Sequence, residues 1–302
     1  MIGGFILLNQ LFPHHIVGNG NHFGMWGDIL PESHWLSQLI APVLILLNAT
    51  FLNLIFNRNE FLEKNNYLVA LLYVTFMSNF HSFYYLDGFA VAQFILGISL
   101  FYFFRLNQNE DARKTVFNVA FLFGLASTFY PLFLFSIPLL FSMIWVMRPF
   151  VFRESLLTLV GFVLPLVYGG VYGMYFEMKL EPSDFSSTSS ELKVLDMIVF
   201  GSAIVWFFMF SLKTLFRKMQ QGSIRLRKLY NMLLMLILLA ILLTSIDYLA
   251  FHKAQTVSLI LIPLMFVLPY GFGYKKQRSI PTMFYYVLFL FSVGKFFIVI
   301  NF

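Results

Sequence analysis

Ten apolar runs follow one another along the chain, most of them close to the roughly 20 residues that an α-helix needs to cross a bilayer. They cover residues 37–56, 67–85, 89–105, 116–130, 132–147, 155–176, 197–213, 229–250, 256–273 and 282–300. Backbone polar groups in lipid must be paired within their own segment, so each run is expected to be a helix. With 59% hydrophobic and 11% charged residues, the sequence predicts an all-α, polytopic transmembrane helical bundle.

Basic residues fall in alternate connections between these runs. If the connection 57–66 is cytoplasmic, alternation puts 16 of the 20 Lys and Arg residues on that side. They are Arg58, Lys64, Arg105, Arg113, Lys114, Arg148, Arg153, Lys213, Arg217, Lys218, Arg225, Arg227, Lys228, Lys275, Lys276 and Arg278. Lys179, Lys193 and Lys253 fall outside, and Lys295 lies within the last run. Cytoplasmic loops are enriched in Lys and Arg, so this bias fixes the orientation and predicts that the C-terminus is outside.

The chain is expected to form a single transmembrane domain over residues 1–302. The outer loops 13–36 and 177–196 are its longest polar connections, and the basic loop 214–228 is expected to contact anionic lipid on the cytoplasmic side. The apolar stretch 1–12 is too short to span. One alternative is a re-entrant or interfacial segment. The expectation is that it is the outer end of a first helix that begins upstream, which would give 11 spans and a cytoplasmic N-terminus.

A candidate site lies in the first outer loop. All six histidines fall on the outer side, and they are His14, His15, His22, His34, His81 and His252. Asp28 and Glu32 are four residues apart, so on a helical turn both carboxylates would share one face. These two are the candidate catalytic residues. His14, His15, His34 and His81 are candidates for metal binding or proton transfer, with a divalent metal as the cofactor. The alternative is an interfacial loop with Trp26 and Trp35 at headgroup depth.

Asp247 and Lys295 are the charges set furthest into the apolar runs. Intramembrane charges are costly and are usually paired or face a cavity, so the two are expected to form an ion pair; alternatively, Lys295 binds a lipid phosphate. Other polar and helix-breaking residues predict interhelical hydrogen bonds, kinks or close packing within the runs. They are Asn48 and Asn53 in 37–56, Gly161, Pro165, Gly169, Gly170 and Gly173 in 155–176, and Pro263 and Pro269 in 256–273.

Three stretches resemble an uncharacterised family of polytopic inner-membrane proteins from Bacteroidota. They are NNYLVALLYVTFMS at 65–78, FNVAFLFGLASTFYP at 117–131 and RPFVFRESLLTLVGFVLPLVYGGVYG at 148–173. This likeness covers most of the chain and implies a multi-pass protein of the bacterial inner membrane, without implying an activity.

A looser resemblance is to the GT-C glycosyltransferases, which use polyprenyl-phosphate-linked sugars at the outer face. Asp28 and Glu32 stand in the matching first outer loop, and Gly124, the pair Tyr130-Pro131 and Arg148 match a glycine-bearing helical hairpin followed by Arg. The adjacent acidic pair of that family and its large outer C-terminal domain are absent from this sequence. The resemblance implies a catalytic role for Asp28, with Glu32 as its partner.

Three functions remain open on the sequence alone. The first is a GT-C-like transferase that binds a polyprenyl-phosphate lipid. The second is a non-catalytic subunit or scaffold that contacts other envelope proteins as well as membrane lipids. The third is a transporter, against which stand the lack of an internal repeat and the few ionisable groups near mid-membrane. Nucleic-acid binding is not expected, because no basic patch stands apart from the apolar runs. The absence of cysteine excludes thiolate chemistry.

Overall fold

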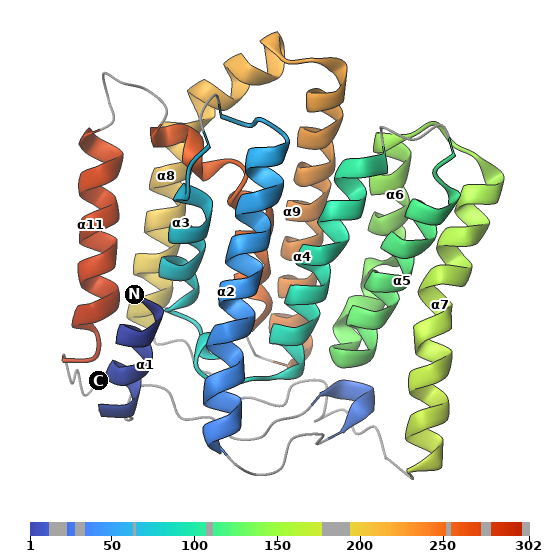
Figure 1. Ribbon diagram of the computed structural model, residues 1–302, viewed down its shortest axis with the longest axis horizontal. Helices are drawn as coiled ribbons and strands as arrows, with labels where there is room; N and C mark the ends of the chain where they lie inside the picture. The colour runs from blue at the N-terminus through green and yellow to red at the C-terminus, as the bar shows by residue number, and fades with distance from the viewer. Residues whose placement is uncertain are drawn as a thin grey trace.

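The computed structural model describes residues 1–11, 23–27, 34–62, 65–106, 111–176, 194–251, 255–272 and 279–297. The regular secondary structure within these ranges is α-helix and 3₁₀-helix, joined by turns, and the long helices run side by side as one bundle (Figure 1). The α-helices are α1 (Ile2–Leu11), α2 (His34–Arg58), α3 (Leu68–Met77), α4 (Gly88–Leu106), α5 (Arg113–Phe129), α6 (Ile137–Met147), α7 (Phe152–Tyr175), α8 (Val194–Gln221), α9 (Ile224–Phe251), α10 (Leu261–Leu264) and α11 (Ser279–Gly294). The 3₁₀ segments are η2 (Gly24–Trp26), η3 (His81–Phe83), η4 (Pro131–Ser136), η6 (Gln255–Ile260) and η7 (Leu268–Phe272).

Several of these helices are suited to a membrane. Within the described residues, four are long and apolar enough to cross one, and they are Leu36–Arg58, Gly88–Leu106, Phe152–Tyr175 and Ile224–Ala250. A fifth is added if the two parts of α8, Val199–Leu212 and Thr214–Gln220, which meet at 43°, count as one span. Each of the ten predicted runs has a helical counterpart. The all-helical architecture, with several apolar helices that could span a membrane, is therefore confirmed, whereas six of the ten runs fall short of, or only conditionally reach, the length of a full span.

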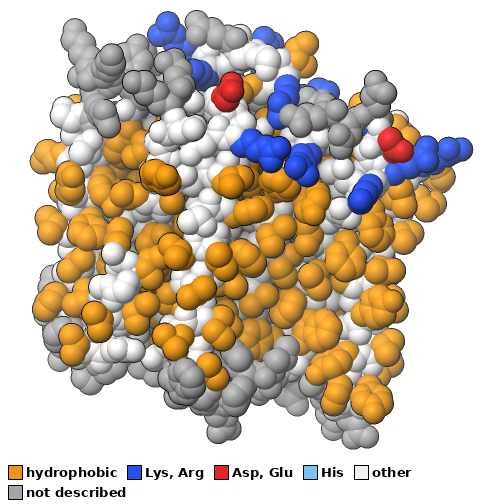
Figure 2. Space-filling view, viewed as in Figure 1, with side chains coloured by type: hydrophobic (Ala, Val, Ile, Leu, Met, Phe, Trp, Pro, Cys, Tyr) orange, Lys and Arg blue, Asp and Glu red, His pale blue; other side chains and the backbone are white. Residues whose placement is uncertain are grey.

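The bundle has two chemically different ends. Arg58 ends α2, Arg113 begins α5 and Arg148 follows α6; Figure 2 shows Lys and Arg side chains gathered at this end above a largely hydrophobic wall. Two hydrogen bonds join the connections here, from Arg225 to Asn59 Oδ1 (2.9 Å) and from Lys228 to the carbonyl of Met147 (3.2 Å). We call this the basic end, and the other the distal end. The alternation predicted from the basic residues is thus present in the order of the helices.

The distal end holds the turn between α3 and α4. Ser37 in α2 accepts a hydrogen bond from the backbone N–H of Leu86 (2.7 Å), and Gln38 bonds the hydroxyl of Tyr85 (3.3 Å). His81 belongs to this turn and stacks on Tyr85, so it lies at the opposite end of the bundle from Arg148. Helix α1 docks here as well, where the buried Phe5 contacts the rings of Phe83 and Phe289.

Glycines bring α5 and α7 into backbone contact. A Cβ on Gly124 would clash with the carbonyl oxygen of Phe162, and a Cβ on Gly161 would lie 2.9 Å from the carbonyl oxygen of Phe117. Such small residues let membrane helices approach closely, where dispersion and weak Cα–H contacts stabilise the pair. Close packing of the 155–176 run is therefore confirmed at Gly161, whereas Gly170 faces open space.

The predicted helix over 256–273 is not continuous. It consists of η6, α10 and η7 with a turn before Leu268, because Pro263 and Pro269 lack the N–H that a helix requires. Nearly all of this segment is buried, and Phe266 packs on the rings of Phe61 (5.4 Å) and Phe104 (5.3 Å). Irregular backbone at membrane depth is tolerated only where protein or a cavity shields it from lipid. The segment is therefore a shielded core element rather than a lipid-facing span.

The predicted run 67–85 is likewise shorter as a helix, because α3 ends at Met77 and gives way to turns. Ser78 Oγ donates to the carbonyl of Thr75 (2.7 Å), and Tyr84 donates to the carbonyl of Ser78 (2.8 Å). These local side-chain bonds satisfy backbone groups that another helical turn would otherwise pair. The predicted interhelical hydrogen bond of Asn48 is confirmed, since its amide donates to the Tyr73 hydroxyl in α3 (2.7 Å).

Candidate functional site at the distal end

The predicted site falls largely on residues whose placement the structure does not describe. Asp28, Glu32, His14 and His15 lie outside the described residues, and for His34 only the backbone at the start of α2 is described. Their roles stay predictions. The described parts of the distal end are a turn of the first outer loop, His81, Lys295, and a set of buried carboxylates.

The turn Phe23–Gly27 belongs to the first outer loop and docks on the ends of α5 and α7. Trp26 Nε1 donates a hydrogen bond to Thr128 Oγ1 (2.9 Å), and its ring packs on Phe129 (5.9 Å) and Tyr172 (5.0 Å). Trp26 therefore anchors the loop to protein, where the sequence had left open an interfacial position at headgroup depth.

Gly24 is required in this turn for two reasons. Its φ of +59° lies in the left-handed region that favours glycine, and a Cβ would lie 2.6 Å from the carbonyl oxygens of Thr128 and Phe129. The sequence Gly-Met-Trp-Gly thus specifies one docked conformation. The docked turn ends at Gly27, the residue directly before Asp28 in the sequence.

Asp87 is buried at the start of α4 and caps that helix. Its Oδ1 accepts a hydrogen bond from the backbone N–H of Ala90 (2.7 Å), and its Oδ2 accepts one from Ser82 Oγ (3.1 Å). A carboxylate at a helix N-terminus satisfies an otherwise unpaired N–H and interacts favourably with the helix dipole. The main role of Asp87 is therefore to begin α4 at a fixed point.

Asp247 is fully buried near the end of α9. Its Oδ2 accepts hydrogen bonds from the backbone N–H (3.2 Å) and the hydroxyl (3.0 Å) of Thr256, and its Oδ1 accepts one from the hydroxyl of Tyr130 (3.4 Å). Both Asp247 and Asp87 lie close enough to act electrostatically on the Tyr130 hydroxyl. We call Asp87, Tyr130, Asp247 and Thr256 the buried acidic cluster.

This cluster joins three connections that are far apart in the sequence. Tyr130 stands between α5 and η4, at the position that the sequence matched to a helical hairpin, while Asp87 directly precedes α4 and Thr256 lies in the first turn of η6. The sequence alone assigned no role to Asp87 or to the hydroxyl of Tyr130. The sequence held one indication of this cluster: the alternation of the predicted helices assigns positions 87, 130 and 247 to the same side of the membrane.

Lys295 and Asp247 have different partners. Lys295 Nζ donates to the carbonyl oxygen of Ser78 (2.6 Å) and to Asn79 Oδ1 (3.3 Å), next to the rings of Tyr84 and Phe296. The predicted ion pair between Lys295 and Asp247 is not among the ion pairs within the described part of the chain. Lys295 instead ties α11 to the turn after α3.

His81 is the one histidine whose side chain the structure describes. It is 6% exposed, and neither ring nitrogen has a hydrogen-bond partner within the described ranges. Burial lowers the pKa of His81 from its usual 6.5 to about 4. His81 is therefore neutral near pH 7 and contributes mainly its ring, stacked on Tyr85 with centroids 5.0 Å apart.

The depressed pKa predicts a stability effect of acid. In the unfolded chain His81 binds a proton below its usual pKa of 6.5, whereas in the folded protein it binds one only below a pKa of about 4. The free energy of unfolding is therefore unaffected by His81 above pH 6.5. Between pH 6.5 and pH 4 the titration of His81 lowers it by up to about 1.4 kcal/mol per pH unit. The variant His81→Phe keeps a stacked ring and should have a shallower loss of unfolding free energy between pH 6.5 and 4. Equal slopes for wild type and variant would contradict this assignment.

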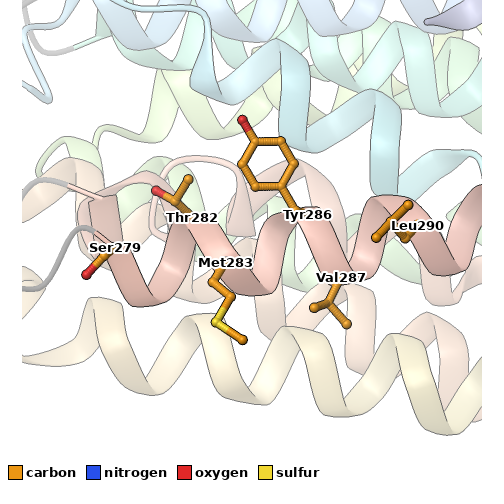
Figure 3. Close-up of a pocket in the computed structure, with 6 residues that line it drawn as sticks. All are labelled: Ser279, Thr282, Met283, Tyr286, Val287 and Leu290. Atoms are coloured by element: carbon orange, nitrogen blue, oxygen red, sulfur yellow. The ribbon is translucent and has the colours of Figure 1, made fainter.

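No group of three or more His, Asp or Glu side chains that could hold a metal occurs among the described residues. The carboxylate oxygens of Asp247 accept hydrogen bonds from Thr256 and Tyr130, which ties this carboxylate into the protein. A shallow groove of about 610 Å³ lies elsewhere, along α11, and Figure 3 shows the side chains that line it. Its lining includes Met283, Val287 and Leu290 and no charged group, as expected of a lipid-facing surface.

Comparisons with protein-family models, with curated proteins and with solved structures gave no match to this chain.

Proposed function

We propose that the protein is a GT-C-like transferase of the bacterial inner membrane that uses a polyprenyl-phosphate-linked sugar at its distal end. In this proposal the basic end faces the cytoplasm, the distal end and the C-terminus face outward, and Asp28 and Glu32 carry the chemistry. The observation that supports it best is the docked turn Phe23–Gly27. A loop that served only as a connection would have no need of a glycine fitted against two carbonyls and a tryptophan bonded to Thr128.

The proposed reaction forms a glycosidic bond between the sugar and an acceptor hydroxyl. Asp28 takes the proton of that hydroxyl as a general base, and the hydroxyl oxygen attacks the anomeric carbon. The bond to the lipid phosphate breaks, and the polyprenyl phosphate leaves with the electron pair. Glu32 orients Asp28 or the acceptor. The buried acidic cluster contributes by fixing the hairpin on which the loop rests, because its carboxylates are already bonded to protein donors.

The test is sugar transfer by purified protein in lipid vesicles that contain a radiolabelled polyprenyl-phosphate sugar. Asp28→Ala should lower the rate by on the order of 10² or more, as expected for loss of a general base. Trp26→Ala, which undocks the loop, should lower it as well while the protein stays folded. Trp145→Ala is the matched control, because Trp145 lies half exposed in α6, towards the basic end. Wild-type function of Asp28→Ala and Glu32→Ala variants in cells would exclude the enzyme and favour a scaffold.

A further inference from the structure

A second polar site lies at the other end of the bundle, between the end of α2 and the beginning of α3. It is a pocket of about 450 Å³, and six of its eight lining residues carry a polar group on their side chain. They are Thr50, Asn53, Asn57, Arg58, Asn65 and Tyr67. Its lining contains none of the proposed catalytic residues, and the proposal below does not depend on the proposed function.

The polar residues of α2 are spaced to share one face of the helix. Positions 50, 53, 54, 57 and 58 follow the i, i+3, i+4, i+7, i+8 pattern of a single helical stripe. Leu54 lies in this stripe and is 50% exposed, as is expected of a residue that faces lipid. A polar stripe on the membrane-facing side of a helix is costly unless a polar group covers it.

Asn53 is the strongest indication that a ligand belongs here. It is only 5% exposed, it lines the pocket, and its carbonyl oxygen has no hydrogen-bond partner among the described residues. A buried polar atom left in this state costs about 1–3 kcal/mol. The carbonyl oxygen of Asn53 therefore does not form the predicted interhelical hydrogen bond within the described part of the chain. By contrast, the side chain of Asn57 donates to the carbonyl of Asn66 (2.9 Å) and accepts from its N–H (3.3 Å).

The pocket also carries positive charge. Arg58 is exposed, and the ion pairs within the described ranges do not include it. Its guanidinium lies over the ring of Phe101 (5.6 Å), and Arg105 lies over the same ring (4.2 Å). Two guanidinium groups held around one ring concentrate positive charge beside the pocket, and guanidinium forks match the oxygens of a phosphate.

The pocket opens toward lipid. Leu47 and Leu54 on α2 and Leu71 on α3 are exposed beside it, and Tyr67 at its rim is exposed at the level of the basic end. We propose that this pocket binds the headgroup of an anionic phospholipid that carries hydroxyl groups. The phosphate oxygens accept hydrogen bonds from Arg58 and from the Asn53 amide nitrogen, a headgroup hydroxyl donates to the Asn53 carbonyl oxygen, and the acyl chains lie along the leucines.

The test is retention of phosphatidylglycerol by the purified protein, titrated in detergent and measured by native mass spectrometry. Arg58→Gln and Asn53→Leu should each weaken retention about tenfold, the effect of losing one charge-assisted hydrogen bond. Arg113→Gln removes the same charge at the same end, outside the pocket, and should bind as wild type. Asn53→Leu should also leave the thermal stability unchanged or raised, because it removes an unpaired buried amide, and this separates lost binding from lost folding.

Two further ligands test whether the pocket requires both the phosphate and the acyl chains. Diacylglycerol, which lacks the phosphate, should bind at least about tenfold more weakly than phosphatidylglycerol. Glycerol 3-phosphate should not compete at comparable concentration, because it lacks the chains. Equal retention by Arg58→Gln, Asn53→Leu and Arg113→Gln, equal binding of diacylglycerol, or full competition by glycerol 3-phosphate would each overturn the proposal.

Discussion

Replacing Gly124 by leucine is expected to lower the free energy of unfolding by about 3 kcal/mol or more. A Cβ at this position meets the carbonyl oxygen of Phe162, which is backbone and cannot rotate away. The helices α5 and α7 would have to separate, and the contact at Gly161 would be lost with the one at Gly124. The measurement is unfolding in mixed micelles titrated with a denaturing detergent.

The matched control is Gly170→Leu. Gly170 lies in α7 as Gly161 does, but nothing stands within 4 Å of a Cβ built on it. The same change of glycine to leucine in a membrane helix should therefore be neutral or stabilising there. Equal destabilisation by the two variants would show that the α5–α7 contact is not as close as described.

Replacing Asp247 by alanine is the second change with a large expected effect, about 3–5 kcal/mol of destabilisation. The N–H and hydroxyl of Thr256 and the hydroxyl of Tyr130 would lose their common acceptor inside the bundle. Each buried donor left unpaired costs about 1–3 kcal/mol. Because η6 is short and irregular, its start at Thr256 is expected to detach first, which hydrogen exchange can follow.

Two milder substitutions should destabilise the protein by less than Asp247→Ala does. Asp247→Asn keeps one acceptor oxygen and should cost less than Asp247→Ala. Tyr130→Phe removes only the bond of 3.4 Å and should cost about 1 kcal/mol. If Asp247→Ala were no more destabilised than Tyr130→Phe, the carboxylate would not be the centre of this network.

The helical architecture was largely predictable from the sequence, because lipid forces each apolar run to pair its own backbone groups. The order of the two ends was also predictable, since Arg58, Arg113 and Arg148 flank alternate helices. The break between the runs 116–130 and 132–147 coincides with Pro131, which lacks the N–H that a continuing helix requires.

What hydropathy could not supply is the environment of each run. The runs 37–56 and 256–273 were both predicted to span, but many side chains of the first are exposed and the described part of the second is buried on nearly every side. An apolar residue is equally suited to a lipid-facing surface and to the core of the bundle. Only the packing of the other helices decides which of the two it occupies. The same holds for α3, whose end at Met77 depends on local bonds of Ser78 and Tyr84.

The candidate site was only partly predictable. Gly24 and Trp26 were visible in the first outer loop, but their fit against Thr128 is a contact across about a hundred residues of chain. The bonds of Asp247 to Tyr130 and Thr256 likewise depend on where three separate connections meet. Sequence patterns assign such residues to a side of the membrane, and packing decides which of them touch.

An outward-facing site requires that the basic end and the distal end face opposite sides of the membrane, and the absence of cysteine from the sequence allows a direct test. Single cysteines are placed at Arg113, exposed at the start of α5, and at Tyr175, exposed at the end of α7. In right-side-out spheroplasts, a membrane-impermeant maleimide should label Tyr175→Cys directly and Arg113→Cys only after permeabilisation. Labelling of both positions from outside, or of Arg113→Cys alone, would contradict the orientation and with it the outward-facing site.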